Sequence, residues 1–131
     1  MYLHLYKGNP TAGGVDGSQV SEGTGLNPID MAALDSANNE IGVAIKLALR
    51  CDAGYNTSGN TTITPIGTTA ADWALSADNI TYGAYGAVLT ITSVVGVVNT
   101  VIYAIPKSTL SDGPINDTSV DLQIAGLIVA V

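Results

Sequence analysis

The sequence predicts an all-β protein made of two stacked antiparallel sheets. Two observations carry this prediction: apolar side chains alternate with polar or small ones along the clearest segments, and glycines separate these segments at short intervals. Alternation at every second residue turns one face of a strand toward a core and the other toward solvent, whereas a helix repeats every 3.6 residues. Glycines at this spacing favour short strands joined by turns over alternating strands and helices.

The N-terminal segment, residues 1–26, differs in composition from residues 27–131, which we expect to form the β-sandwich domain. Leu3 and Leu5 alternate with tyrosines and a histidine, and this alternation predicts a strand over residues 2–6.

The glycine-rich stretch that follows, residues 7–26, holds six glycines and almost no bulky apolar side chain. Such a stretch is expected to be either an arm that orders on assembly or a surface loop. A further interpretation is a strand pair anchored by Val15 and Val20, with its turn at Asp16-Gly17.

The strongest strand signal lies at residues 41–51. Its larger apolar residues share one parity, namely Ile41, Val43, Ile45, Leu47, Leu49 and Cys51. Lys46 and Arg50 fall on the opposite parity, as expected when one face of a strand meets the core and the other meets water. We therefore expect a long half-buried strand in which Cys51 is a small buried hydrophobe rather than a reactive thiol.

Shorter strands are expected in runs rich in β-branched residues, at 61–66, 87–92 and 100–105, with a further candidate at 73–76. Helix is nearly absent from the prediction. Residues 29–37, which Asp30 can cap, leave room for a turn or two, and residues 68–72 for a similar short turn.

The last segment, residues 120–131, is the second strong strand. One parity carries Val120, Leu122, Ile124, Gly126 and Ile128. From Leu127 onward both parities are apolar, so the end of the strand is either sandwiched on both faces or covered by a neighbouring chain.

Composition and charge exclude several functions. Four Lys plus Arg against 11 Asp plus Glu give a net charge of −7, which repels nucleic acid and an anionic membrane surface alike. One His and one Cys exclude a disulfide within the chain and a single-chain Cys/His zinc site. The apolar stretches fall short of the roughly 20 residues that a spanning helix needs, and the start lacks a secretory signal. We expect synthesis in the cytoplasm, no membrane insertion and no cofactor.

Catalytic residues are sparse. His4 is the only imidazole, and Asp16, Asp30 or Asp35 can in principle orient it as a general base. No spacing brings a Ser or Cys nucleophile beside His4, so a histidine on a strand face without chemistry is the favoured interpretation. The acidic residues are scattered mostly singly, which disfavours the carboxylate pair that glycoside hydrolysis requires. We therefore expect that the protein is not an enzyme.

One acidic cluster is a candidate calcium site. It precedes the last strand and consists of Asp112, Asn116, Asp117 and Asp121. Oxygen ligands at this spacing can hold a calcium ion, although the pattern matches no EF-hand loop. An Asx-rich connecting loop explains the same residues and is the favoured interpretation.

Three aromatic residues form the best candidate binding patch: Trp73, Tyr82 and Tyr85. The two tyrosines lie in a glycine-rich loop, where their rings can stack on a sugar or contact a protein. The alternative is that these rings cap the end of the sandwich.

The segments 73–79, 82–86, 89–91, 99–100 and 120–122 resemble small structural proteins encoded in phage and prophage virion or tail gene clusters. The similarity covers roughly the last 60 residues and leaves residues 1–72 unmatched. It implies an immunoglobulin-like antiparallel β-sandwich of about 7–8 strands that builds or decorates a particle through self-association, without catalysis. The Cys pair flanking a Trp of true antibody domains is missing, which excludes that family.

A structural or assembly protein is therefore the expected function, with self-association or other particle proteins as its partners and the virion or tail as its location. A glycan- or protein-binding module that uses the aromatic loop is the alternative. An enzyme that uses acidic residues alone is the third and least favoured class.

Overall fold

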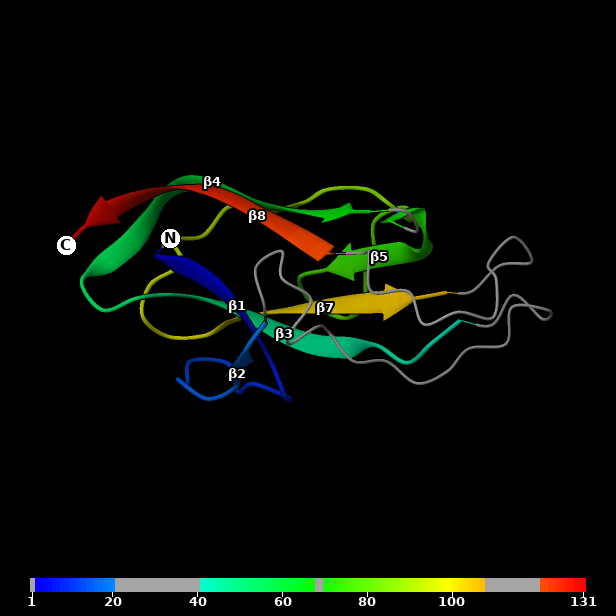
Figure 1. The fold of residues 1–131 in the computed structure, drawn as a ribbon, viewed down its shortest axis with the longest axis horizontal. Helices are drawn as coiled ribbons and strands as arrows, with labels where there is room; N and C mark the ends of the chain where they lie inside the picture. The colour runs from blue at the N-terminus through cyan, green and yellow to red at the C-terminus, as the bar shows by residue number, and fades with distance from the viewer. Residues whose placement is uncertain (1, 21–40, 68–69, 108–120) are drawn as a thin grey trace.

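The computed structural model describes residues 2–20, 41–67, 70–107 and 121–131 and confirms the predicted antiparallel β-sandwich (Figure 1). Its eight strands are β1 (Leu3–Lys7), β2 (Ser18–Gln19), β3 (Ile45–Cys51), β4 (Tyr55–Ile66), β5 (Trp73–Ser76), β6 (Leu89–Ile91), β7 (Thr100–Pro106) and β8 (Asp121–Ala130). A short 3-10 turn, η2 (Ala70–Asp72), is the one helical element among the described residues and lies where a short turn was predicted.

The eight strands form two sheets. One has the order β2-β1-β3-β7-β5 and the other the order β6-β4-β8, and every pair is antiparallel. Figure 1 shows β4 and β8 running side by side as a long twisted ribbon, with β1, β3 and β7 forming the neighbouring layer. The N and C labels lie at the same end of the molecule.

The core lies between the sheets and is filled by the inward parity of each strand. Its fully buried side chains include Leu47, Leu49, Ile63, Val95 and Ile102, and Leu3 and Leu5 of β1 join them. The short runs predicted from β-branched residues all contain strands, because those residues pack well on a half-buried pleated surface.

The strand predicted at 41–51 begins only at Ile45, and this part of the prediction was wrong. Ile41 makes a single bridge to Lys107, and Val43 is 84% exposed. The ladder between β3 and β7 ends at the Ile45–Ala104 pair, two residues before Pro106, which has no backbone N–H to donate. The inward parity holds at Leu47, Leu49 and Cys51, but Ala48 on the opposite parity is also fully buried.

The C-terminal strand follows its predicted parity, with Leu122 buried and Ile124 and Ile128 packed against the core. Its last outward residues are exposed: Leu127 by 67%, Val129 by 38% and Val131 by 76%. The chain's own sheets therefore do not sandwich this end on both faces, which removes one of the two predicted arrangements.

The N-terminal strand lies within the five-stranded sheet, between β2 and β3. The chain then loops out and returns as β2, which pairs with the end of β1. Val20 is buried and its N–H donates to the Leu5 carbonyl, whereas Val15 is exposed. The predicted strand pair with its turn at Asp16-Gly17 was therefore wrong: β2 pairs with β1 across a longer loop, and only Val20 of the two predicted anchors is buried. The helical turn predicted at 29–37 lies outside the described residues.

Among the described residues, no helix is long and apolar enough to cross a membrane.

Candidate functional site

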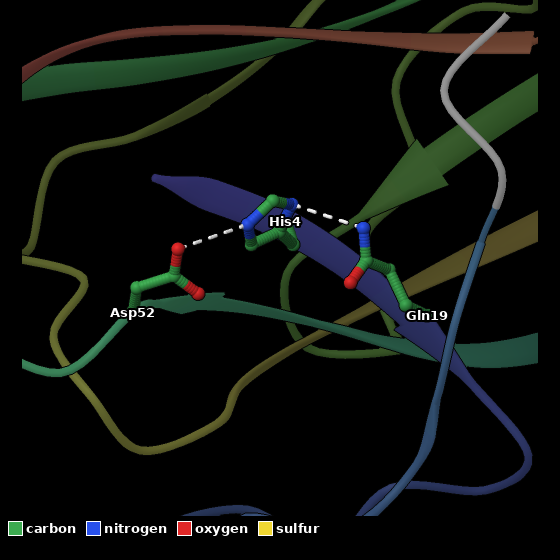
Figure 2. Close-up of polar contacts among 3 residues, drawn as sticks. All are labelled: His4, Gln19 and Asp52. Atoms are coloured by element: carbon green, nitrogen blue, oxygen red, sulfur yellow. Dashed lines mark hydrogen bonds and ion pairs between the residues drawn. The ribbon is translucent and has the colours of Figure 1, made fainter. Parts of the chain in front are cut away.

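His4 lies on the outer face of the five-stranded sheet, where it bridges β2 and the end of β3 (Figure 2). Its Nε2 is 3.3 Å from Oδ2 of Asp52, and the Gln19 amide nitrogen is 3.2 Å from its Nδ1. With Nε2 protonated, the ring donates to the Asp52 carboxylate and accepts from the Gln19 amide. Both ring nitrogens are therefore engaged in contacts that hold neighbouring strands together.

Asp52 contacts His4, whereas the carboxylate of Asp16, one of the three aspartates considered from the sequence, bonds Thr11 and Asn99. The other two, Asp30 and Asp35, lie outside the described residues. The register explains the contact with Asp52, because His4 lies opposite Arg50 in the β1–β3 pair and Asp52 is two residues further along the same face. His4 and Asp52 are 48 positions apart in the sequence, so spacing did not indicate this contact. The arrangement supports the interpretation of His4 as a structural histidine.

A second polar cluster lies next to His4 and centres on Arg50. Its guanidinium carbon is 3.8 Å from the centroid of the Tyr6 ring. One guanidinium nitrogen donates to the Asp16 carbonyl at 3.0 Å and to Oδ1 of Asn99 at 2.9 Å. The buried Asn99 side chain in turn donates to the Asp16 carboxylate at 2.9 Å.

Asp16 joins this cluster to the loop between β1 and β2. The Thr11 backbone N–H and hydroxyl both donate to its carboxylate, each at 2.9 Å. These bonds, led by the one from the Thr11 N–H, lower the pKa of Asp16, because they stabilise its charged form. The backbone of Asn99 also pairs with Gly13 and Gly14. The cluster therefore fastens the loop onto β3 and the segment before β7.

The three predicted aromatic contacts do not gather on one exposed surface. Trp73 is 8% exposed and belongs to the core. The Tyr82 hydroxyl donates to the Asn79 side chain, and burial raises the pKa of Tyr82. The Tyr85 ring centroid is 4.1 Å from the ammonium nitrogen of Lys107. Binding of a glycan or a protein by these residues stays a prediction.

The loop that carries the two tyrosines covers the edge of β5. The N–H groups of Gly83 and Gly86 donate to the Leu75 and Trp73 carbonyls, at 3.1 and 2.7 Å. Gly86 has a φ of +84°, a conformation that glycine adopts without strain. The loop backbone thus takes the place of a further strand along this edge.

Asp78 organises the tip of the same loop, a role that the sequence analysis missed. Its carboxylate accepts bonds from the N–H groups of Thr81 and Ile80 and from the Ser76 hydroxyl. These bonds, the one from Thr81 first, lower the pKa of Asp78. The sequence signal for such a turn is the Asp itself, whose side chain can bond the backbone two residues further on, but aspartates are also common in loops without such bonds.

Cys51 is buried, as predicted, and its Sγ donates to the Val95 carbonyl at 3.4 Å. Burial, assisted by the nearby Asp52 charge, raises the pKa of the thiol. The thiol form is therefore favoured, and the thiolate that reacts as a nucleophile is disfavoured.

The candidate calcium ligands Asp112, Asn116 and Asp117 lie outside the described residues, as does the side chain of Asp121. Calcium binding therefore stays a prediction. Elsewhere in the described chain, no group of three or more His, Cys, Asp or Glu side chains is placed to hold a metal ion. A pocket of about 350 Å³ lies between the end of β1 and the start of β3, away from the predicted aromatic and histidine sites.

The exposed apolar end of β8 is a further candidate surface, and we term Leu127, Val129 and the adjoining Val131 the β8 strip. Its first two residues lie opposite Ser58 and Asn56 of β4. The apolar residues of the β8 strip thus lie beside polar residues of the adjacent strand, β4.

Comparisons with protein-family models, with curated proteins and with solved structures found no match.

Proposed function

We propose that this chain is a non-enzymatic structural protein that acts through self-association, as a component of a phage-like virion or tail. The observation that carries the proposal is the β8 strip, in which three large apolar side chains are exposed at the end of one strand. Contiguous apolar surface is costly to leave in water and marks sites where proteins associate.

Charge favours association at this place over others. Copies of a chain with a net charge of −7 repel one another, and the repulsion is smallest where the contact brings no carboxylates together. Residues 124–131 contain no ionisable side chain. A contact through the β8 strip therefore gains apolar burial without adding to the repulsion.

The polar clusters support a structural role rather than catalysis. His4 and Arg50 hold strands and a loop in place, and Cys51 is a buried thiol. The assignment to a virion or tail rests on the resemblance of residues 73–122 to phage structural proteins. The alternative, a glycan- or protein-binding module, has less support because Trp73 lies in the core and Lys107 contacts the ring of Tyr85.

Light scattering at several protein concentrations tests the proposal. We expect a mass above 13.3 kDa that rises with concentration, and more so at high salt, because salt screens the repulsion between acidic copies. A constant mass of 13.3 kDa at millimolar concentration would overturn it. A glycan array separates the alternative: binding that Tyr82→Ala abolishes would favour a binding module.

A further inference from the structure

We infer that two copies of this chain join edge to edge through β8, so that two three-stranded sheets become one sheet of order β6-β4-β8-β8-β4-β6. The inference rests on the proposed function and names its partner, a second copy of the chain, and the surface that meets it.

The four sheet edges differ in how well they are protected. β2 has two residues and β6 has three, too few for a long ladder. β5 is covered by backbone bonds from Gly83 and Gly86. β8 has ten residues and pairs on one side with β4, and along its residues 124–130 no strand that the structure describes lies on the other side.

The sequence of β8 lacks the usual defences of an edge strand. Natural edges carry Lys, Pro or a bulge, which block pairing with another chain. Residues 124–131 contain no Lys, Arg or Pro. The ladder with β4 is irregular between Ser58 and Thr62, but the extra residues are on β4, so β8 itself stays regular. Its edge is therefore suited to accept a strand.

The chemistry of the edge fits a second copy better than a different partner. An antiparallel strand that pairs with itself about a two-fold axis is self-complementary, and its apolar side chains then meet apolar side chains. The β8 strip carries no charge that would select an acidic or a basic partner. Self-pairing also keeps the acidic remainder of each copy on opposite sides of the contact.

The size of the contact sets its expected strength. Residues 124–131 extend over about 27 Å, and an edge about 10 Å thick then offers roughly 270 Å² per copy. A standard stable interface buries about 800 Å² per partner, so one β8 contact is expected to be weak and concentration-dependent. Such a contact becomes effective when an assembly repeats it or adds others.

Hydrogen exchange of the full chain at low and high concentration tests the inference directly. Pairing protects the β8 amides that face away from β4, so we expect slower exchange in a peptide covering 124–131 at high concentration and no change at β6. Association without this protection would overturn the inference and leave the proposed function standing. A strict monomer at every concentration would overturn both.

Charged substitutions give an independent test. The double variant Leu127→Lys/Val129→Lys places two cations on the edge strand. We expect the dimer dissociation constant, measured by sedimentation equilibrium, to rise at least tenfold. The matched control, Val43→Lys/Ile80→Lys, changes exposed residues outside β8 and shifts the net charge by the same amount, from −7 to −5. The lower net charge alone would strengthen association, so a loss confined to the β8 variant identifies the edge.

Equal weakening in both lysine variants would overturn the inference, because it would show an effect of charge at any position. If the β8 lysine variant fails to fold, Leu127→Thr/Val129→Thr keeps β-branched or strand-compatible side chains while removing apolar surface. Unchanged dimerisation in that variant would also contradict pairing through β8.

Discussion

The outer faces of β3 and β8 show opposite relations between pattern and burial. β3 alternates apolar and polar residues as a half-exposed strand does, yet Ala48 on its outward parity is fully buried and Tyr6 beside it is 9% exposed. β8 ends in residues that are apolar on both parities, yet Leu127 and Val131 face solvent. The difference shows that alternation identifies a strand, whereas the rest of the fold decides how many of its faces are covered.

The stability of a single folded chain is expected to depend mainly on the five-stranded sheet, which contains β3. Its outer face is tied down by His4, Arg50 and Asp16, and its inner face forms much of the core. The exposed end of β8 is expected to contribute little to the stability of a single chain. The following predictions sharpen or break this contrast.

Deleting residues 1–20 is expected to have the largest effect. The deletion removes β1 and β2, and with them Leu3 and Leu5 from the core. We expect the truncated chain to lose its cooperative thermal unfolding transition, as measured by circular dichroism. A truncated chain that still unfolds in one sharp transition would mean that β1 is dispensable and that the comparison is wrong.

A pair of matched Leu→Ala changes compares the two strands directly. Leu47→Ala leaves a cavity in the core and is expected to lower the free energy of unfolding by about 2–5 kcal/mol. Leu127→Ala changes an exposed side chain, so we expect a change within about 0.5 kcal/mol. Urea denaturation at low protein concentration measures both, and similar losses from the two variants would contradict the contrast.

Asn99→Ala tests how much the polar cluster contributes. Asn99 is 5% exposed and bonds to Asp16, Thr11 and Arg50. Its removal deletes hydrogen bonds to the charged Asp16 and Arg50 side chains, and because bonds to charged groups are the stronger ones, we expect a loss of about 1–3 kcal/mol in urea denaturation. Asn60→Ala, at an exposed position of β4, is the control and is expected to be nearly neutral.

The smallest expected effect is a pH dependence from Asp16. Its pKa is lowered in the folded chain, so its contribution to stability is present above the unfolded value of about 3.8 and is lost as pH falls through the folded pKa. Asp16→Asn is expected to reduce this part of the acid dependence in unfolding experiments at pH 2–6. An unchanged acid profile would show that the Thr11 and Asn99 bonds do not stabilise the charged carboxylate.

Much of the fold could be predicted from local pattern, because the strands at 61–66, 73–76 and 100–105 carry side chains that pack well on a pleated surface. The start of β3 could not, since it depends on where pairing with β7 ends, at Ile45 and Ala104. The burial of Trp73 was equally out of reach, because four consecutive buried residues in β5 show no alternation.

The polar contacts were less predictable than the strands. His4 meets Asp52 only through the pairing of β1 with β3, and Arg50 meets Asn99 through a loop distant in sequence. Such contacts depend on register and loop paths, which no spacing within one segment encodes. The apolar end of β8 was the exception, because both of its parities are apolar in the sequence itself.

The concealment of the Cys51 sulfur has a practical consequence for structural work in solution. Because this sulfur is shielded and held in its protonated form, maleimide reagents near neutral pH are expected to leave it unmodified. A reporter cysteine introduced at Val43, which is exposed and lies outside the β8 strip, would then be the site that takes a spin label or fluorophore, with the native thiol retained. Distances between labelled copies would then report whether and how copies of the chain pack together.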